Sequence, residues 1–173
     1  MRPRALDDLL ACLGRLRDAN AKWCEVAAVH HEHLMVSRLA QAEACLPDLE
    51  RILLAVAEEE NLRIETTIEL ADLLDIPSDP PPRLDELVAA LPEDLGRELS
   101  KAGSRLREAL VGARSLADRI RGVAEIGLRI SESVLSMTRR AATASSRPPA
   151  AYVRGGRRTA GTAVPVYQRA WRA

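Results

Sequence analysis

The sequence has no phenylalanine, and its only aromatic residues among 173 are Trp23, Tyr152, Tyr167 and Trp171. Three of these four lie after residue 150, so a core formed by the preceding residues has to be almost purely aliphatic. Hydrophobic residues make up 47% of the chain and charged residues 29%. This combination favours a helical bundle or a coiled coil over a sheet protein.

Cysteines and long apolar runs are also scarce. Cys12, Cys24 and Cys45 are odd in number and have no CxxC spacing, which argues against a disulfide framework. No stretch approaches 18 uncharged apolar residues, so we expect no membrane insertion. The basic start meets Asp7 and Asp8 before any apolar run, unlike a signal peptide. We therefore expect a reduced, cytoplasmic protein.

Acidic residues are missing from the last part of the chain. All 25 lie at or before Glu132, where 17 basic residues accompany them and leave a net charge of −8. From Ser133 onward there are eight arginines and no acid. After Arg140 the composition changes to Ala, Ser, Pro, Gly and Arg, which cannot bury a core. We predict a disordered basic tail over residues 141–173.

Heptad spacing is the main pattern that is present. Steps of three and four predict a first helix whose seam is Leu6, Leu9, Leu13, Leu16, Asn20, Trp23, Ala27, His30 and Leu34. This seam breaks near Ser37, a candidate N-cap, and Pro47 fits only an early helical turn or a kink. A second helix is expected to reach about Asp75, with its seam at Leu54, Ala57, Asn61, Ile64, Ile68 and Ala71. The run of acids at 58–60 is interpreted as a solvated face.

Four prolines in the segment IPSDPPPR predict a linker over residues 76–83. The segment LDELVAALPEDL then predicts a short amphipathic helix and a new helix start at Pro92. Strict three-four steps follow at Leu95, Leu99, Ala102, Leu106, Ala109, Ala113, Leu116, Ile120, Val123, Gly127, Ile130, Val134 and Met137. The predicted fold is all-α: a helical hairpin over 1–75, the linker, a short helix and a long heptad helix over 84–140, and the tail. Together the helices form a coiled coil or helical bundle.

Known motifs of catalysis and nucleotide binding are absent from the sequence, and we expect neither an enzyme nor a cofactor. The segment WCEVAAVHHEH offers Cys24, His30, His31 and His33 as metal ligands. They do not converge on one helix face, so we interpret it as a partly exposed helix end rather than a metal site. The arginines and aromatic residues of the tail could contact nucleic acid, but the acidic body would repel phosphates. We expect no nucleic acid partner.

The order and spacing of these segments resemble the FlgN family of cytoplasmic export chaperones of the bacterial flagellum. The likeness covers nearly the whole chain and is sharpest in three segments: LDELVAALPEDL (84–95), GLRISESVL (127–135) and AYVRGG (151–156). The chain departs from the family at Ala124 and Gly127, where asparagine is frequent. The resemblance implies that the protein binds the helical terminal segments of hook–filament junction proteins of the FlgK and FlgL type. It would keep them unassembled and deliver them to the type III export apparatus.

The resemblance places the client-binding surface on the second half of the long helix, at Leu116, Ile120, Val123, Gly127, Ile130, Val134 and Met137. Gly127 is either a notch for a client side chain or a point where the second helix approaches closely. Tyr152 and Trp171 are candidate anchors for the export machinery. The alternatives are a coiled-coil scaffold without a client and a helical regulator that depends on nucleic acid or metal. The oligomeric state is left open.

Overall fold

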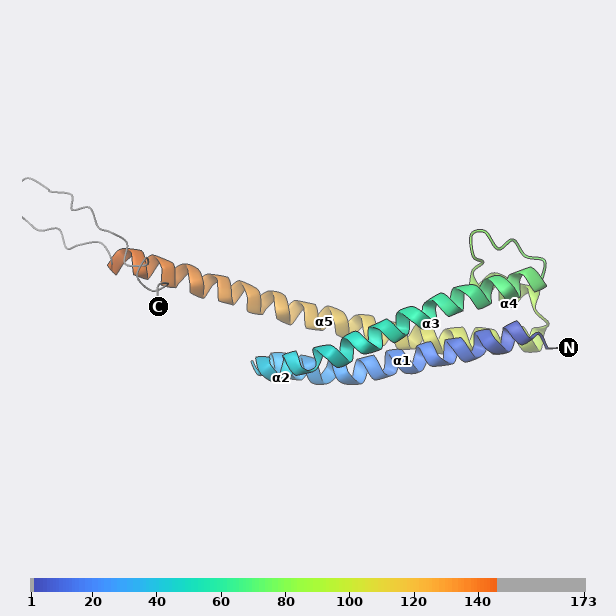
Figure 1. Ribbon diagram of the computed structural model, residues 1–173, viewed down its shortest axis with the longest axis horizontal. Coiled ribbons are helices and arrows are strands. Elements are labelled where there is room, and N and C mark those ends of the chain that lie inside the picture. Colours follow the sequence, from blue (N-terminus) through green and yellow to red (C-terminus); the bar gives the residue numbers. More distant parts are fainter. Residues whose placement is uncertain (1, 146–173) are drawn as a thin grey trace, which may run out of the picture. The chain divides into compact units, whose positions relative to one another are not determined.

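The computed structural model describes residues 2–145, and within them the chain is helical, with no strand. The helices are α1 (Arg4–Met35), α2 (Leu39–Ala44), α3 (Leu46–Leu73), α4 (Leu84–Ala90) and α5 (Glu93–Ser145) (Figure 1). The predicted all-α fold class, with a helical hairpin and a long last helix, is therefore confirmed. The chain consists of two units, Met1–Ala124 and Glu125–Ala173, and the boundary between them falls inside α5. The predicted disordered tail lies outside the described residues, except that α5 continues to Ser145.

Helices α1 and α3 lie side by side as an antiparallel hairpin, with the short α2 at its turn (Figure 1). The predicted seam of α1 is confirmed, because Leu6, Leu9, Leu13, Leu16, Asn20, Ala27 and His30 are all buried and Trp23 and Leu34 are partly buried. The side-chain Nδ2 atom of Asn20 donates a hydrogen bond to the backbone carbonyl oxygen of Leu16 at 2.8 Å. A polar residue on the seam is thus satisfied within its own helix, which removes most of the cost of burying it.

The predicted seam of α3 is wrong in its first half. Leu54, Ala57 and Asn61 are exposed, whereas Ile64 and Ile68 are half-buried and Ala71 is buried. The face that packs in the hairpin follows another three-four series, at Leu49, Ile52, Val56, Glu59, Arg63, Thr66 and Leu70. Three polar residues interrupt this series, so a search for apolar periodicity selected the neighbouring, exposed stripe instead.

Two helix ends use a residue in the left-handed region. Ser37, at φ 56°, follows α1, and Asp75, at φ 55°, follows α3. In each case the next amide bonds a carbonyl five residues back: Arg38 N to His33 O at 2.9 Å, and Ile76 N to Ala71 O at 3.0 Å. This is the Schellman motif, usually made with glycine. Ser37 therefore ends α1, and the prediction that it caps the start of the next helix is wrong. Pro47 lies in the first turn of α3, one of the two positions predicted for it.

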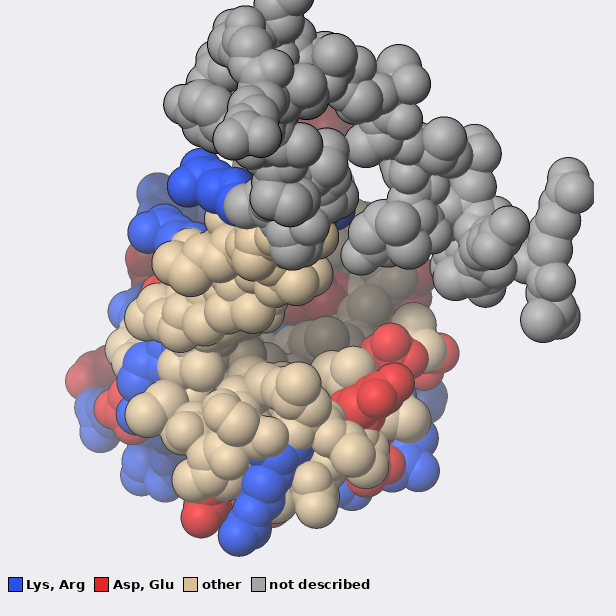
Figure 2. Space-filling model, turned by 90° about the vertical axis from the view of Figure 1, so that its left-hand side faces the viewer, with Lys and Arg blue, Asp and Glu red and all other residues tan. Residues whose placement is uncertain are grey.

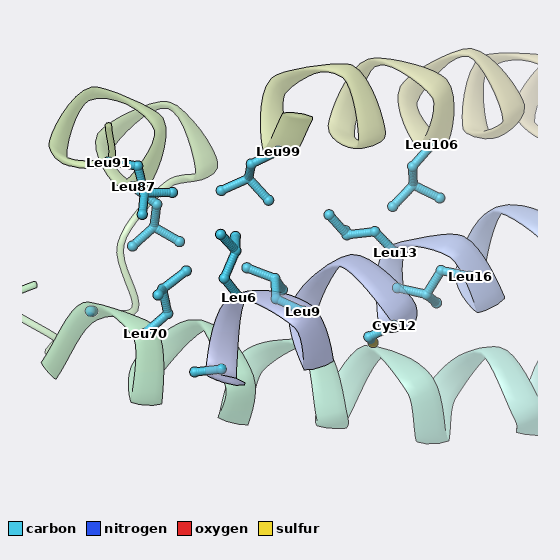
Figure 3. Packing of buried hydrophobic residues seen from close by; sticks show 12 residues of the cluster. Leu6, Leu9, Cys12, Leu13, Leu16, Leu70, Leu87, Leu91, Leu99 and Leu106 are labelled. Carbon is cyan, nitrogen blue, oxygen red and sulfur yellow. The ribbon is translucent and has the colours of Figure 1, made fainter. Parts of the chain in front are cut away.

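The main core joins the open end of the hairpin to α4 and the first turns of α5. In Figure 3, Leu99 and Leu106 of α5 point toward the leucines of α1, while Leu87 and Leu91 lie near Leu70 of α3. Close backbone approach fixes α4 on α5, because a Cβ atom added to Gly96 would lie 2.8 Å from the carbonyl oxygen of Val88. The first half of the α5 stripe thus belongs to the core of the unit Met1–Ala124. Among the described helices, none combines the length and the apolar character needed to cross a bilayer.

Candidate binding surface

The predicted client-binding residues fall into two environments. Leu116 is 6% exposed and packs in a small apolar cluster with Ala27 and Leu49. Ile120 packs against the same cluster, and Val123 is half-buried. These three residues belong to the unit Met1–Ala124, where at least the side chains of Leu116 and Ile120 serve the internal packing of that unit.

The other predicted residues lie in the unit Glu125–Ala173 and are exposed. Ile130, Val134 and Met137 have exposed fractions of 59%, 55% and 66%. The predicted client-binding set did not include three more large apolar side chains in the part of α5 after Ala124, which are also exposed: Ile126, Leu128 and Leu135. The prediction of client-binding residues followed a single heptad seam, and Leu128 and Leu135 lie beside that seam. This part of α5 therefore presents far more apolar surface than one seam contains.

Apolar and charged residues occupy separate sectors of this helix. Successive residues of a helix are about 100° apart around its axis. Between Ile126 and Ala142, one arc of about 200° contains no charged residue. We call this arc the distal apolar surface; its members are Ile126, Gly127, Leu128, Ile130, Ser131, Val134, Leu135, Met137, Thr138, Ala141 and Ala142. The opposite sector holds every charged residue of the segment: Glu125, Arg129, Glu132, Arg139 and Arg140.

Two hydroxyl groups within the distal apolar surface are satisfied by the helix itself. Ser131 Oγ donates to the carbonyl oxygen of Gly127 at 3.0 Å, and Thr138 Oγ1 donates to that of Val134 at 2.8 Å. A partner could cover both residues without stranding a hydrogen-bond donor. The arc can therefore be buried over its full width at little polar cost.

Gly127 leaves open space at the surface of this helix, since a Cβ atom added there would meet no described atom within 4 Å. The position is therefore open to a side chain of a binding partner. Which of the two predicted roles of Gly127 holds, client notch or close helix approach, stays a prediction.

One residue of the histidine-rich segment of α1 makes a structural hydrogen bond. His30 is buried, and its Nδ1 atom lies 2.9 Å from the carbonyl oxygen of Ala42 in α2. His30 thus links the two helices at the turn of the hairpin. Within residues 2–145 no group of three or more His, Cys, Asp or Glu side chains is arranged to hold a metal ion.

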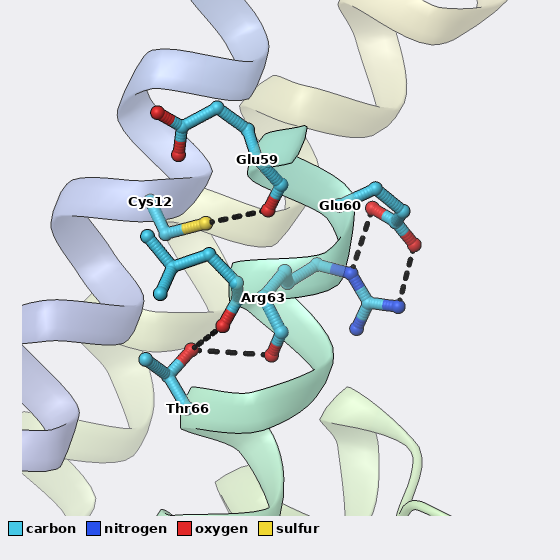
Figure 4. A network of polar contacts seen from close by, with 6 residues as sticks. Cys12, Glu59, Glu60, Arg63 and Thr66 are labelled. Carbon is cyan, nitrogen blue, oxygen red and sulfur yellow. Dashed lines mark hydrogen bonds and ion pairs between the residues drawn. The ribbon is translucent and has the colours of Figure 1, made fainter. Parts of the chain in front are cut away.

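A polar cluster interrupts the seam between α1 and α3 (Figure 4). The Cys12 thiol donates to the carbonyl oxygen of Glu59 at 3.1 Å, and Arg15 Nε donates to Glu59 Oε1 at 2.7 Å. Glu59 is thus part of the seam, with 24% of its side chain exposed, and the interpretation of residues 58–60 as a solvated face is wrong at this position. Burial, with the bond to Glu59, raises the pKa of Cys12 to about 11. A thiol this weakly acidic is a poor nucleophile at neutral pH, so the cluster has a structural role.

Open depressions on the surface of the unit Met1–Ala124 are lined by α1 together with α3 and by α5 alone. A more enclosed groove of about 350 Å³ lies between α1 and α5. Its lining combines small and apolar residues with charged ones: Leu10, Leu13, Gly14, Arg17, Glu98, Lys101, Ala102 and Arg105. Near the hairpin turn, Met35, Val36, Leu39, Leu53 and Leu54 are more than half exposed. Figure 2 looks toward this end, and residues other than Lys, Arg, Asp and Glu cover much of the face. Exposed apolar surface, rather than a cavity, is therefore the main feature available for binding.

No known protein family model, curated protein or solved structure matches this chain. Tyr152 and Trp171, the candidate anchors for the export machinery, lie outside the described residues, and their role stays a prediction.

Proposed function

We propose that the protein is an export chaperone of the flagellar type III pathway that binds helical terminal segments of hook–filament junction proteins. The observation that carries this proposal is the distal apolar surface, whose large side chains are more than half exposed. A monomer gains nothing by leaving so much apolar area in water, so such a patch marks an interaction site. Its form, a long amphipathic helix, suits a partner that is itself helical.

The order of segments in the sequence supports the same proposal. A helical hairpin, a proline-rich linker, a short helix and a long last helix follow one another as the resemblance to FlgN chaperones implies. The terminal helices of junction proteins are expected to be amphipathic and to self-associate when bare. A chaperone that covers their apolar faces would keep them apart until export, and it would act in the cytoplasm.

Binding through Ile130 can be tested by co-expressing the chain with tagged junction proteins of the FlgK and FlgL type. Ile130→Asp would place a charge in the middle of the contact and should weaken capture at least tenfold, about 1.4 kcal/mol. Ser136→Asp adds the same charge to the polar sector and should leave capture unchanged. Far-UV circular dichroism checks that both variants remain helical. If helical Ile130→Asp protein captures the client as well as wild type, this surface is not the client site.

A coiled-coil scaffold without a client is the second candidate, because the same apolar surface could pair with another copy of the chain. Light scattering on the purified chain separates the two functions. A scaffold should form an oligomer that Ile130→Asp dissociates, and it should capture no junction protein. A chaperone should capture the client whether or not the free chain is monomeric.

A further inference from the structure

The distal apolar surface contains two heptad seams rather than one. The first seam is Gly127, Ile130, Val134, Met137 and Ala141, and the second is Leu128, Ser131, Leu135, Thr138 and Ala142. Each follows alternating steps of three and four, and the second is the first shifted by one residue. The two seams therefore run along the same helix about 100° apart.

One partner helix cannot cover both seams. A helix that packs against a single neighbour needs an apolar stripe about 100° wide, and a two-stranded coiled coil uses an even narrower one. The distal apolar surface spans about twice that width. A single docked helix would leave Leu128 and Leu135, or Ile130 and Met137, in contact with water.

The second seam is suited to a closely packed neighbour. Its leucines alternate with Ser131, Thr138 and Ala142, whose side chains are small. The two hydroxyl groups already bond the helix's own carbonyl oxygens, so they need no partner. Small residues between larger ones let two helix backbones approach each other while the leucines fill the remaining space.

The charges beside the surface indicate what kind of helices fit. Arg140 and Arg129 flank the edge beside the first seam, whereas Arg139 and Glu132 flank the edge beside the second, and none of the three arginines forms an ion pair within residues 2–145. A second copy that pairs on the first seam would bring the same two arginines to that edge. The chain's own residues 146–173 would add six more arginines and no acid. A partner helix with acidic residues beside its apolar stripe would instead complement the first edge, and the second edge, which has charges of both signs, suits a partner helix that also carries both.

We infer that residues 126–142 bind two amphipathic helices of one client at the same time, each helix on its own seam, with acidic flanks on the helix that covers the first seam. This inference rests on the proposed chaperone function and specifies the form of its client. The client segment is then a helical pair, and α5 contributes one further helix to a three-helix assembly. Covering both seams buries the full apolar arc, which one helix cannot do.

The inference is tested by measuring the affinity of three single variants for a purified full-length junction protein. Ile130→Asp charges the first seam, Leu135→Asp charges the second, and Ser136→Asp is the control on the polar sector. We expect at least a tenfold loss of affinity for each seam variant and less than a twofold change for the control. If Leu135→Asp binds within twofold of wild type while Ile130→Asp does not, one helix binds on one seam. The chaperone function would then stand, and the two-helix inference would be wrong.

Photo-crosslinking provides the direct reading. With p-benzoylphenylalanine at position 130 or at position 135, the crosslinks should map to two different segments of the client. Crosslinks from both positions to one segment would overturn the inference. If wild-type protein binds no junction protein, the proposed function and the inference both fail. If light scattering shows a homodimer that Leu135→Asp dissociates, a second copy covers this seam and the client pair is excluded.

Discussion

Thr66 and Thr67 are neighbours in α3, and both are buried, but their hydroxyl groups differ. Thr66 Oγ1 donates to the carbonyl oxygens of Leu62 and Arg63 at 2.9 and 3.1 Å (Figure 4). Thr67 is 2% exposed, and its Oγ1 has no hydrogen-bond partner among the described residues. A buried hydroxyl without a partner lowers the free energy of unfolding, because it gives up its bonds to water and gains none in return.

Replacing these threonines by valine should therefore have different effects. Thr67→Val removes the unpaired hydroxyl at nearly constant shape and should raise the free energy of unfolding by about 1 kcal/mol. Thr66→Val removes a hydroxyl that is already satisfied, so its gain should be smaller or negative. Urea unfolding followed by circular dichroism measures both. If both variants raise the free energy of unfolding equally, the Thr67 hydroxyl has a hydrogen-bond partner in solution.

At the scale of the helix, the glycines of α5 have opposite environments. Gly96 is buried against α4, where an added Cβ atom would lie 2.8 Å from the Val88 carbonyl oxygen, whereas at Gly112 it would meet no described atom within 4 Å. Gly96→Ala should lower the free energy of unfolding by about 1–3 kcal/mol, because a backbone atom has to move. Gly112→Ala should raise it by up to about 1 kcal/mol through helix propensity. Thermal unfolding of the two variants compares them, and a stable Gly96→Ala protein would contradict the close packing of α4.

Helix by helix, the sequence predicted the seam of α1 and the length of α5 because apolar residues occupy most positions of both seams. It failed on α3, where Glu59, Arg63 and Thr66 occupy the packed face and leucines such as Leu54 lie outside. Polar seam residues are tolerated there because each has a hydrogen-bond partner, Arg15 of α1 for Glu59 and a nearby residue of α3 for Arg63 and Thr66. These bonds become visible only in three dimensions. The candidate surface was predicted in part for a related reason. Periodicity could not show that the stripe is buried at Leu116 and exposed at Ile130, since burial depends on which helices are nearby.

At the scale of the whole molecule, every fully buried residue of the described chain lies in the unit Met1–Ala124. A chain that ends at Ala124 should therefore keep its cooperative unfolding transition, with a midpoint within a few degrees of the full-length value. The same truncation should abolish client capture, because it removes the distal apolar surface. Differential scanning calorimetry and co-purification measure the two effects. Loss of the transition would mean that residues after 124 are needed for the fold.

The exposed surface of α5 also determines how firmly its backbone is held. From Glu125 to Thr143 every side chain except that of Ala142 is exposed, so this part of the helix depends almost entirely on its own hydrogen bonds. Helices of this length without packing are marginal in water, and opening one turn costs little there. Amide protons in this segment should therefore exchange with solvent much faster than those of α1 and α3. A partner that covers the apolar arc would slow this exchange. The segment that recognises the client would then be among the most strongly protected parts of the protein, but only while the client is bound.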